Sequence, residues 1–146
     1  MLDRRQIHTV IDTLIREARI RSVSDIHITE GMPVWYRIHG CLTQARDVLK
    51  EYDIREVLLG MMNEKQRKQF EDGRDVDFAW QTTDGCRQRV NIFCEQKKIA
   101  ATIRLLNQHI PTLEELKIPT TLYQLSEEPR GIILVTGPTG SGKTYL

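Results

Sequence analysis

Residues 1–20 carry apolar side chains at the spacing of one helix face. Asp3 precedes them as a candidate N-cap, because its side-chain oxygen can accept a hydrogen bond from the first turn. The apolar positions recur every three or four residues, which is the period of an amphipathic α-helix; they are Ile7, Val10, Ile11, Leu14, Ile15 and Ala18. The pattern predicts a helix of about four turns that packs one side against the rest of the chain.

Shorter runs of alternating apolar and polar residues follow, which is the period of β-strands buried on one face. The runs are 24–29 (SDIHIT), 34–40 (VWYRIHG), 75–81 (DVDFAWQ), 87–96 (RQRVNIFCEQ) and 99–106 (IAATIRLL). Gly31 and Pro33 mark a turn between the first two runs. Thr83-Asp84-Gly85 and a short Gln-Lys-Lys segment predict hairpin turns between the last three.

Two helices are predicted between these two groups of strands. Asp53 with Glu56, and Asn63 with Gln66, have the spacing of capping boxes, in which two residues satisfy each other's backbone N–H groups at a helix start. Gly73 is placed to end the second helix. Residues 1–106 therefore predict an α+β domain, in which helices pack on a meander of strands.

Prolines and a change of pattern separate this domain from the last residues. Residues 107–128 have the composition of an interdomain linker, and Pro111 and Pro119 lie within it. Thr112 and Glu115 have capping-box spacing, which predicts a short helix over 113–116. The continuous apolar run GIILVT (131–136) then predicts a buried parallel strand.

Composition narrows the classes of function. Apolar residues make up 40% of the chain and charged residues 28%, which is typical of a globular protein. The 21 basic and 20 acidic residues leave a formal net charge of +1, so no overall field predicts direct nucleic-acid binding. No apolar run approaches the roughly 18 residues of a membrane helix, so no membrane insertion is expected. Residues 1–20 also lack the features of a signal peptide.

The cysteines and histidines predict neither a disulfide nor a metal centre. Cys41, Cys86 and Cys94 have no metal-type spacing, and we expect buried or half-buried thiols in a reducing cytosol. The four histidines have no partner at metal-ligand spacing either. Asp25 and His27 fall on one strand face, where we expect a structural hydrogen-bonded pair.

The segment GPTGSGKT fits the phosphate-loop pattern G-x-x-x-x-G-K-[ST], directly after the predicted buried strand. Its glycines let several backbone N–H groups point at phosphate oxygens. Lys143 is expected to bring positive charge to the β- and γ-phosphates of ATP, and the Thr144 hydroxyl to coordinate Mg²⁺. The candidate ATP-binding residues are Gly137, Pro138, Thr139, Gly140, Ser141, Gly142, Lys143 and Thr144.

This loop alone does not make a complete ATPase site. The carboxylates that hold Mg²⁺ and orient the attacking water belong to later strands, and the sequence ends at Leu146. We therefore expect the chain by itself to hydrolyse no ATP and to bind it weakly or not at all. We also expect the natural gene product to be longer.

A series of motifs resembles the type II/type IV secretion ATPase superfamily from about residue 2 to 144, and most closely the twitching-motility (pilus retraction) ATPases. The motifs are SDIHITEGMPVWYRIHG, MNEKQRKQFEDGRDVDFAW, RQRVNIF, TIRLL, PTLEELKIP and PRGIILVTGPTGSGKT, in this order. Many ATPases share the phosphate loop. The series SDIHI, R-x-H-G and RVNIF is the more specific part of the resemblance.

This resemblance implies an architecture and a function. It implies a PAS-like N-terminal domain (1–106), a linker (107–128) and the truncated start of a RecA-like ATPase domain (129–146). It implies a homo-hexameric motor that uses ATP and Mg²⁺ for type IV pilus retraction or type II secretion-like transport. The motor is implied to be cytoplasmic and bound peripherally to an inner-membrane platform protein of the pilus or secretion machine.

The resemblance also implies that arginines of the N-terminal domain reach the nucleotide and neutralise phosphate charge. By motif position the candidates for this catalytic role are Arg89 and Arg104, with Arg87 as a third. Strand periodicity is compatible with this role, and an arginine fork suits a triphosphate because it offers planar, permanently charged donors. The alternative from the residues alone is a solvated surface, or salt bridges to Asp75 and Asp77.

Two other functions remain open at this point. The PAS-like domain could act as a ligand-sensing or partner-docking module, with the ATPase secondary. The phosphate loop could instead belong to a different enzyme, such as a kinase, with an unrelated N-terminal extension. The second alternative leaves the N-terminal motif series unexplained.

Overall fold

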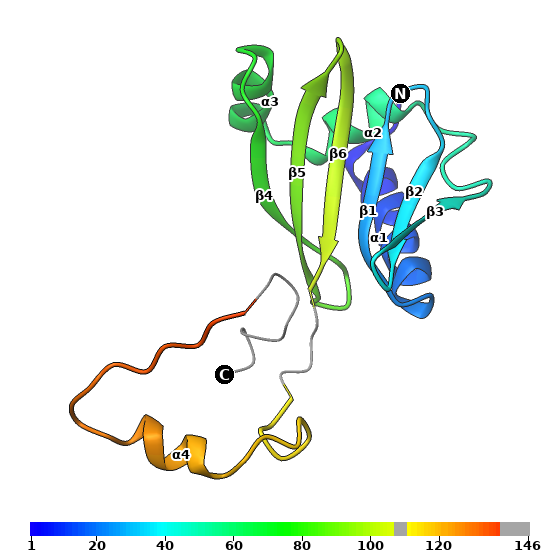
Figure 1. The fold of residues 1–146 in the computed structure, drawn as a ribbon. Coiled ribbons are helices and arrows are strands. Elements are labelled where there is room, and N and C mark those ends of the chain that lie inside the picture. The colour runs from blue at the N-terminus through cyan, green and yellow to red at the C-terminus, as the bar shows by residue number, and fades with distance from the viewer. Residues whose placement is uncertain (107–110, 138–146) are drawn as a thin grey trace. The chain divides into compact units, whose positions relative to one another are not determined.

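The computed structural model describes residues 1–106 and 111–137 (Figure 1). The chain divides into two units, Met1–Leu106 and Asn107–Leu146, and each is described by itself. The elements of the first unit are α1 (Arg4–Ile20), β1 (Val23–Thr29), β2 (Val34–Ile38), β3 (Cys41–Ala45), α2 (Ile54–Met61), α3 (Glu64–Glu71), β4 (Val76–Gln81), β5 (Arg87–Glu95) and β6 (Lys98–Leu105). The described part of the second unit contains α4 (Thr121–Ser126).

The strands of the first unit form one six-stranded sheet in the order β3-β2-β1-β6-β5-β4. Every neighbouring pair is antiparallel. Two meanders, β1-β2-β3 and β4-β5-β6, are therefore joined where the first strand pairs with the last, as Figure 1 shows. Ile26 of β1 lies opposite Ile103 of β6 in this central pair.

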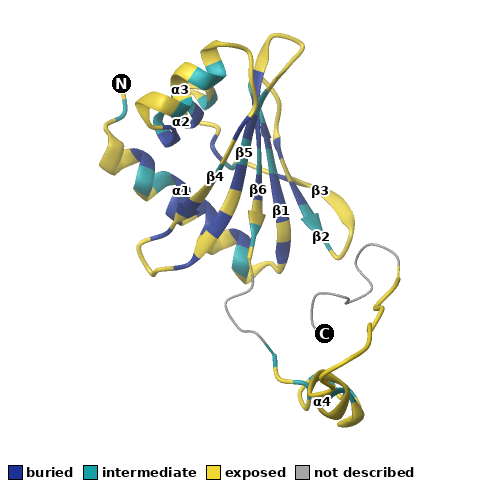
Figure 2. Ribbon diagram, turned by 90° about the vertical axis from the view of Figure 1, so that its left-hand side faces the viewer, coloured by how far each residue is buried: buried dark blue, intermediate teal, exposed yellow. Residues whose placement is uncertain are grey.

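Three helices cover one face of the sheet, while the other face of the first unit carries no helix (Figure 2). Contacts join α1 to β1 and α2, α2 to β6, and α3 to β4. Buried and exposed positions alternate along the strands, as expected when only one face is covered. The completely buried apolar residues are Ile11, Ala18, Ile26, Val57, Leu58, Val90, Ile92 and Ile103. The predicted α+β class is confirmed.

The helix starts agree with the predicted caps, with one exception. Asp3 caps α1 and forms a full capping box with Gln6, and Asn63 forms the predicted box with Gln66 at α3. Asp53 caps α2 through the backbone N–H groups of residues 55 and 56. The Glu56 side chain, however, accepts a hydrogen bond from the backbone of residue 2 instead of completing a box. The segment that precedes α1 therefore occupies the Glu56 carboxylate that the local motif would have used.

The structure differs from the sequence predictions at two local segments, β3 and residues 113–116. Strand β3 was not predicted, because four of its five residues are exposed and its sequence shows no alternation. The helix predicted over 113–116 is only a turn. Thr112 and Glu115 do exchange the two capping-box hydrogen bonds, at 2.8 and 3.2 Å. Lys117 then adopts φ 54°, which leaves the helical region of backbone space and ends the turn.

The strand predicted over 131–136 is absent from the structure. Residues 131–137 have no regular secondary structure, and the side chains of Ile132 and Leu134 are 87% and 81% exposed. A strand takes its hydrogen bonds and its burial from neighbouring strands. The described residues of the second unit contain no strand, so this apolar segment has no partner strand among them.

No helix among the described residues is long and apolar enough to span a bilayer. Of the cysteines, Cys86 is buried, whereas Cys41 and Cys94 are exposed, so the expectation of buried or half-buried thiols was wrong for these two. Cys41 begins the outer strand β3, and Cys94 lies near the end of β5.

Candidate functional site

Polar side chains cross the open sheet face in one row, which we call the arginine row: Arg89 of β5, Arg104 of β6, Asp25 of β1 and Arg37 of β2. Each is the cross-strand partner of the next. Arg89 and Arg104 lie directly opposite each other on this face. Two like charges in this position destabilise a sheet. The row therefore needs either compensating acids or a bound anion.

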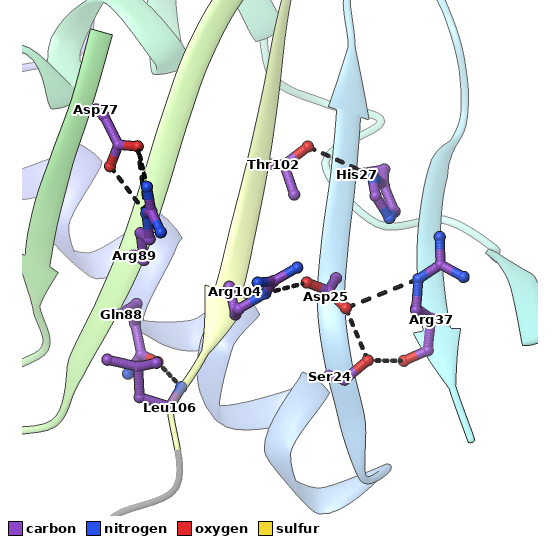
Figure 3. Close-up of polar contacts among 10 residues, drawn as sticks. All are labelled: Ser24, Asp25, His27, Arg37, Asp77, Gln88, Arg89, Thr102, Arg104 and Leu106. Carbon is purple, nitrogen blue, oxygen red and sulfur yellow. Dashed lines mark hydrogen bonds and ion pairs between the residues drawn. The ribbon is translucent and has the colours of Figure 1, made fainter. Parts of the chain in front are cut away.

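Asp25 compensates Arg104 in the centre of the row (Figure 3). Its Oδ1 accepts a hydrogen bond of 2.9 Å from Arg104 Nε, and its Oδ2 accepts one of 2.8 Å from Ser24 Oγ. Arg37 Nε lies 3.7 Å from the same Oδ2. Burial alone would raise the pKa of Asp25, but the hydrogen bonds from Arg104 and Ser24 outweigh it and lower that pKa. Asp25 is therefore ionised at neutral pH.

Asp77 of β4 compensates Arg89 on the other side. Both Asp77 oxygens lie 3.2 Å from Arg89 Nε, and Arg89 Nη2 donates to Oδ2 at 2.8 Å. The hydrogen bond from Arg89 lowers the pKa of Asp77 and raises that of the guanidinium. Arg89 therefore forms a salt bridge with Asp77, as the alternative prediction from the residues alone had it. The Asp75 backbone oxygen instead accepts a hydrogen bond from Gln69.

Between the two arginines the surface is hollowed by about 350 Å³. The lining residues are Asp77, Arg89, Asn91, Thr102 and Arg104. Two guanidinium groups, an amide, a hydroxyl and one carboxylate thus line this space. Such a donor set binds oxyanions, because arginine offers charged, planar pairs of N–H groups.

His27 borders the row without joining it. Its Nδ1 lies 3.4 Å from Thr102 Oγ1, and no hydrogen bond joins it to Asp25 among the described residues. The expected Asp25–His27 pair is therefore wrong, because Asp25 is engaged by Arg104 and Ser24. Burial, and next the charge of Arg37, lower the pKa of His27.

A second polar cluster, which we did not predict from the sequence, fixes the end of β6 by hydrogen bonds. Gln88 Oε1 accepts hydrogen bonds from Arg19 Nη2 at 3.1 Å and from the Leu106 backbone N–H at 3.2 Å. Arg19 Nη2 also donates to the Leu106 carbonyl at 3.0 Å. Gln88 is completely buried. Its polar side chain at a core-facing strand position was the available signal in the sequence.

Most of the predicted phosphate loop lies outside the described residues. Only Gly137 is described, in a segment without regular structure, while Pro138, Thr139, Gly140, Ser141, Gly142, Lys143 and Thr144 lie outside. Their roles toward ATP and Mg²⁺ remain predictions. Among the described residues, no group of three or more His, Cys, Asp or Glu side chains is arranged to hold a metal ion.

This chain is similar in sequence to proteins of a known family. The family described as "Type II/IV secretion system protein" matches residues 1–146. The chain is 33% identical over 135 residues to "Type IV pilus retractation ATPase PilT" of Pseudomonas aeruginosa, covering 92% of the chain and 39% of that protein. It is 35% identical over 135 residues to "Twitching motility protein" of Neisseria gonorrhoeae, covering 90% and 36%.

A solved structure agrees with this relationship. "Crystal Structure of the Pilus Retraction Motor PilT and Bound ADP" superposes with a TM-score of 0.75 at 35% identity, over 92% of this chain and 40% of that one. This chain thus spans well under half the length of the relatives that it matches. The resemblance inferred from its motifs is confirmed, and the chain belongs to the type II/IV secretion system protein family.

Proposed function

We propose that this chain is the N-terminal part of a motor ATPase that couples ATP hydrolysis to type IV pilus retraction or to type II secretion-like transport. The names of its relatives support this class of function. The family match covers the N-terminal unit as well as the phosphate loop, which argues against an unrelated N-terminal extension on a different enzyme.

The observation that carries the proposal is the pair of arginines that face each other on the open sheet face. In the proposed motor, Arg89 and Arg104 contact the phosphates of ATP and neutralise their charge. The hollow of about 350 Å³ between these side chains offers donors of the right chemistry. Phosphate binding would also relieve the repulsion between the two guanidinium groups.

In the complete motor we expect the phosphate loop to bind the same nucleotide. Its backbone N–H groups would cradle the phosphates, Lys143 would contact the β- and γ-phosphates, and the Thr144 hydroxyl would coordinate Mg²⁺. The ion would neutralise charge that develops on the phosphates. In this proposal residues 129–146 begin a RecA-like domain that continues in the complete motor, and residues 1–106 form a PAS-like domain.

The complete motor is proposed to be a homo-hexamer in the cytoplasm. It would act at the inner-membrane face of a pilus or secretion machine, against a platform protein of that machine. Rotation of the ATPase domain relative to the N-terminal domain, about the linker 107–128, would be the mechanical step. Nucleotide contacts with both domains would drive this rotation.

Steady-state ATP hydrolysis by the motor that carries this chain at its N-terminus tests the proposal. Arg104→Ala and Lys143→Ala should each lower kcat/KM by about 100-fold, because each removes a charge that stabilises the transferred phosphoryl group. Arg74→Ala is the matched control, since Arg74 forms an exposed ion pair with Asp72 at the end of α3. Light scattering should show the same hexamer for all variants. Full turnover in Arg104→Ala hexamers would remove Arg104 from the site.

A further inference from the structure

Asp25 is a charged group in an unusual place for a sheet residue. Its side chain is only 8% exposed, in the central strand pair of an otherwise open face. A carboxylate in this environment requires partners, because removing it from water costs more than most single contacts return. Its partners come from three places: Arg104 on β6, Arg37 on β2 and its own neighbour Ser24.

An irregularity in β1 sets up these contacts. The pairing of β1 with β2 shifts register between Val23 and Asp25, so that Ser24 is an extra residue in the strand. A bulge of this kind redirects the neighbouring side chains. Here Val23 is buried in the core while Asp25 faces the arginines. The Ser24 hydroxyl then donates to Asp25 Oδ2 and fixes the carboxylate from the side opposite Arg104.

The two opposed arginines are held in different ways. Asp77 contacts both Nε and Nη2 of Arg89. Asp25 contacts Arg104 through Nε, and neither Nη atom of Arg104 donates a hydrogen bond to another described residue. The Arg104 side chain is 63% exposed. Its outer pair of nitrogen atoms therefore remains available for an anion, while its inner edge is fixed (Figure 3).

We propose that Asp25 is a positioning residue that aims the free end of Arg104 at the nucleotide phosphates. This inference rests on the proposed function of Arg104. Asp25 itself does not touch the nucleotide. It holds the Nε edge of a long, flexible side chain against the repulsion of Arg89, so less conformational freedom is lost when a phosphate binds.

The direct contact is tested first in the chain itself. The Arg104 Nε–H signal in ¹⁵N NMR, identified by its loss in Arg104→Gln, should exchange slowly with water. Asp25→Asn should speed this exchange by roughly tenfold, because a charge-assisted hydrogen bond is lost. Ser24→Ala, which keeps the carboxylate but removes its hydroxyl donor, should give a smaller increase in the same direction. Exchange that is unchanged in both variants overturns the proposal.

The functional part is tested in the complete motor by a double-mutant cycle. Asp25→Asn should lower kcat/KM for ATP by roughly tenfold when Arg104 is present. In the Arg104→Gln background the same change should have less than about a twofold effect, because its only route to the nucleotide is gone. An equal loss in both backgrounds would mean that Asp25 acts through folding or assembly, and it overturns the proposal.

The same experiment includes a matched control, and it distinguishes failure of this inference from failure of the proposed function. Asp72→Asn removes a carboxylate that also pairs with an arginine, at 3.2 Å, but lies at the end of α3; its turnover should match the unmodified motor. If Arg104→Gln alone leaves turnover intact, the proposed role of Arg104 fails, and with it this inference. If Arg104→Gln lowers turnover but Asp25→Asn does not, the inference fails alone.

Discussion

Gly60 in α2 offers a sharp test of the helix layer behind the sheet. A Cβ atom added at this position would lie 1.8 Å from Cδ1 of Ile7 in α1 and 3.1 Å from its Cγ1. Ile7 is only 3% exposed, so the new methyl group would have to displace a packed side chain. Glycine-to-alanine changes inside helices ordinarily stabilise by up to about 1 kcal/mol. Here the expected sign is reversed.

The magnitude follows from two opposing contributions. Overpacking of a filled core costs about 1–3 kcal/mol, and the helix propensity of alanine returns about 1 kcal/mol. We therefore expect Gly60→Ala to lower the free energy of unfolding by about 1 kcal/mol. Ile7→Val, which removes the Cδ1 atom, should cost about 0.5–1.5 kcal/mol by itself. In the double variant the new methyl group fills the space that Cδ1 leaves.

Urea unfolding of the chain, followed by far-UV circular dichroism, measures these free energies. In the Ile7→Val background, Gly60→Ala should become stabilising by about 0.5–1 kcal/mol. The coupling between the two sites should then exceed about 1 kcal/mol, as expected for side chains in direct contact. Equal stabilisation by Gly60→Ala in both backgrounds would refute the α1–α2 packing described above.

Two further predictions concern the open face. Asp77→Asn removes the carboxylate that engages Arg89. Tripolyphosphate should then bind the chain roughly fourfold more tightly in an NMR titration, because a negative charge near the anion is lost. Weaker binding would show instead that Asp77 orients Arg89. Burial and the charge of Arg37 lower the pKa of His27 in the folded chain below 6.5. As the pH drops below 6.5, the unfolded chain therefore binds a proton at His27 more readily than the folded chain, and the free energy of unfolding falls. His27→Gln should flatten that fall between about pH 7 and 5 in urea unfolding, and an identical slope would exclude His27 as its source.

Local features of the fold could be predicted from the sequence because their causes are local. The spacing from Ile7 to Ala18 identifies α1, and Asp3 and Asn63 cap the helices that they precede. Alternation along 87–96 places Arg89 and Val90 on opposite faces of a strand, and in the structure Val90 is buried while Arg89 is exposed. These inferences depend only on side-chain periodicity and on hydrogen bonds between residues three positions apart.

Long-range pairing could not be predicted in the same way. Nothing in the local pattern of 24–29 indicates that β1 pairs with β6, yet this pairing places Asp25 beside Arg104, 79 positions along the chain. The strand prediction for the apolar run 131–136 was wrong because a strand requires a neighbouring strand, and the local sequence does not show whether one is present. The capping box predicted from Asp53 and Glu56 is likewise incomplete, because the Glu56 side chain accepts a hydrogen bond from distant residue 2.

The arrangement of charges on the open face supports the proposed anion site better than a role in stabilising the sheet alone. A row optimised for stability would alternate charges across strands, as Arg104 and Asp25 do. Instead Arg89 and Arg104 face each other directly, and the acid that serves each lies on the far side, toward β4 and β1. The two carboxylates therefore hold the guanidinium groups by hydrogen bonds, and Asp77 also lines the hollow beside them. An anion in that space is the one ligand that would turn the repulsion between the two arginines into attraction on both sides.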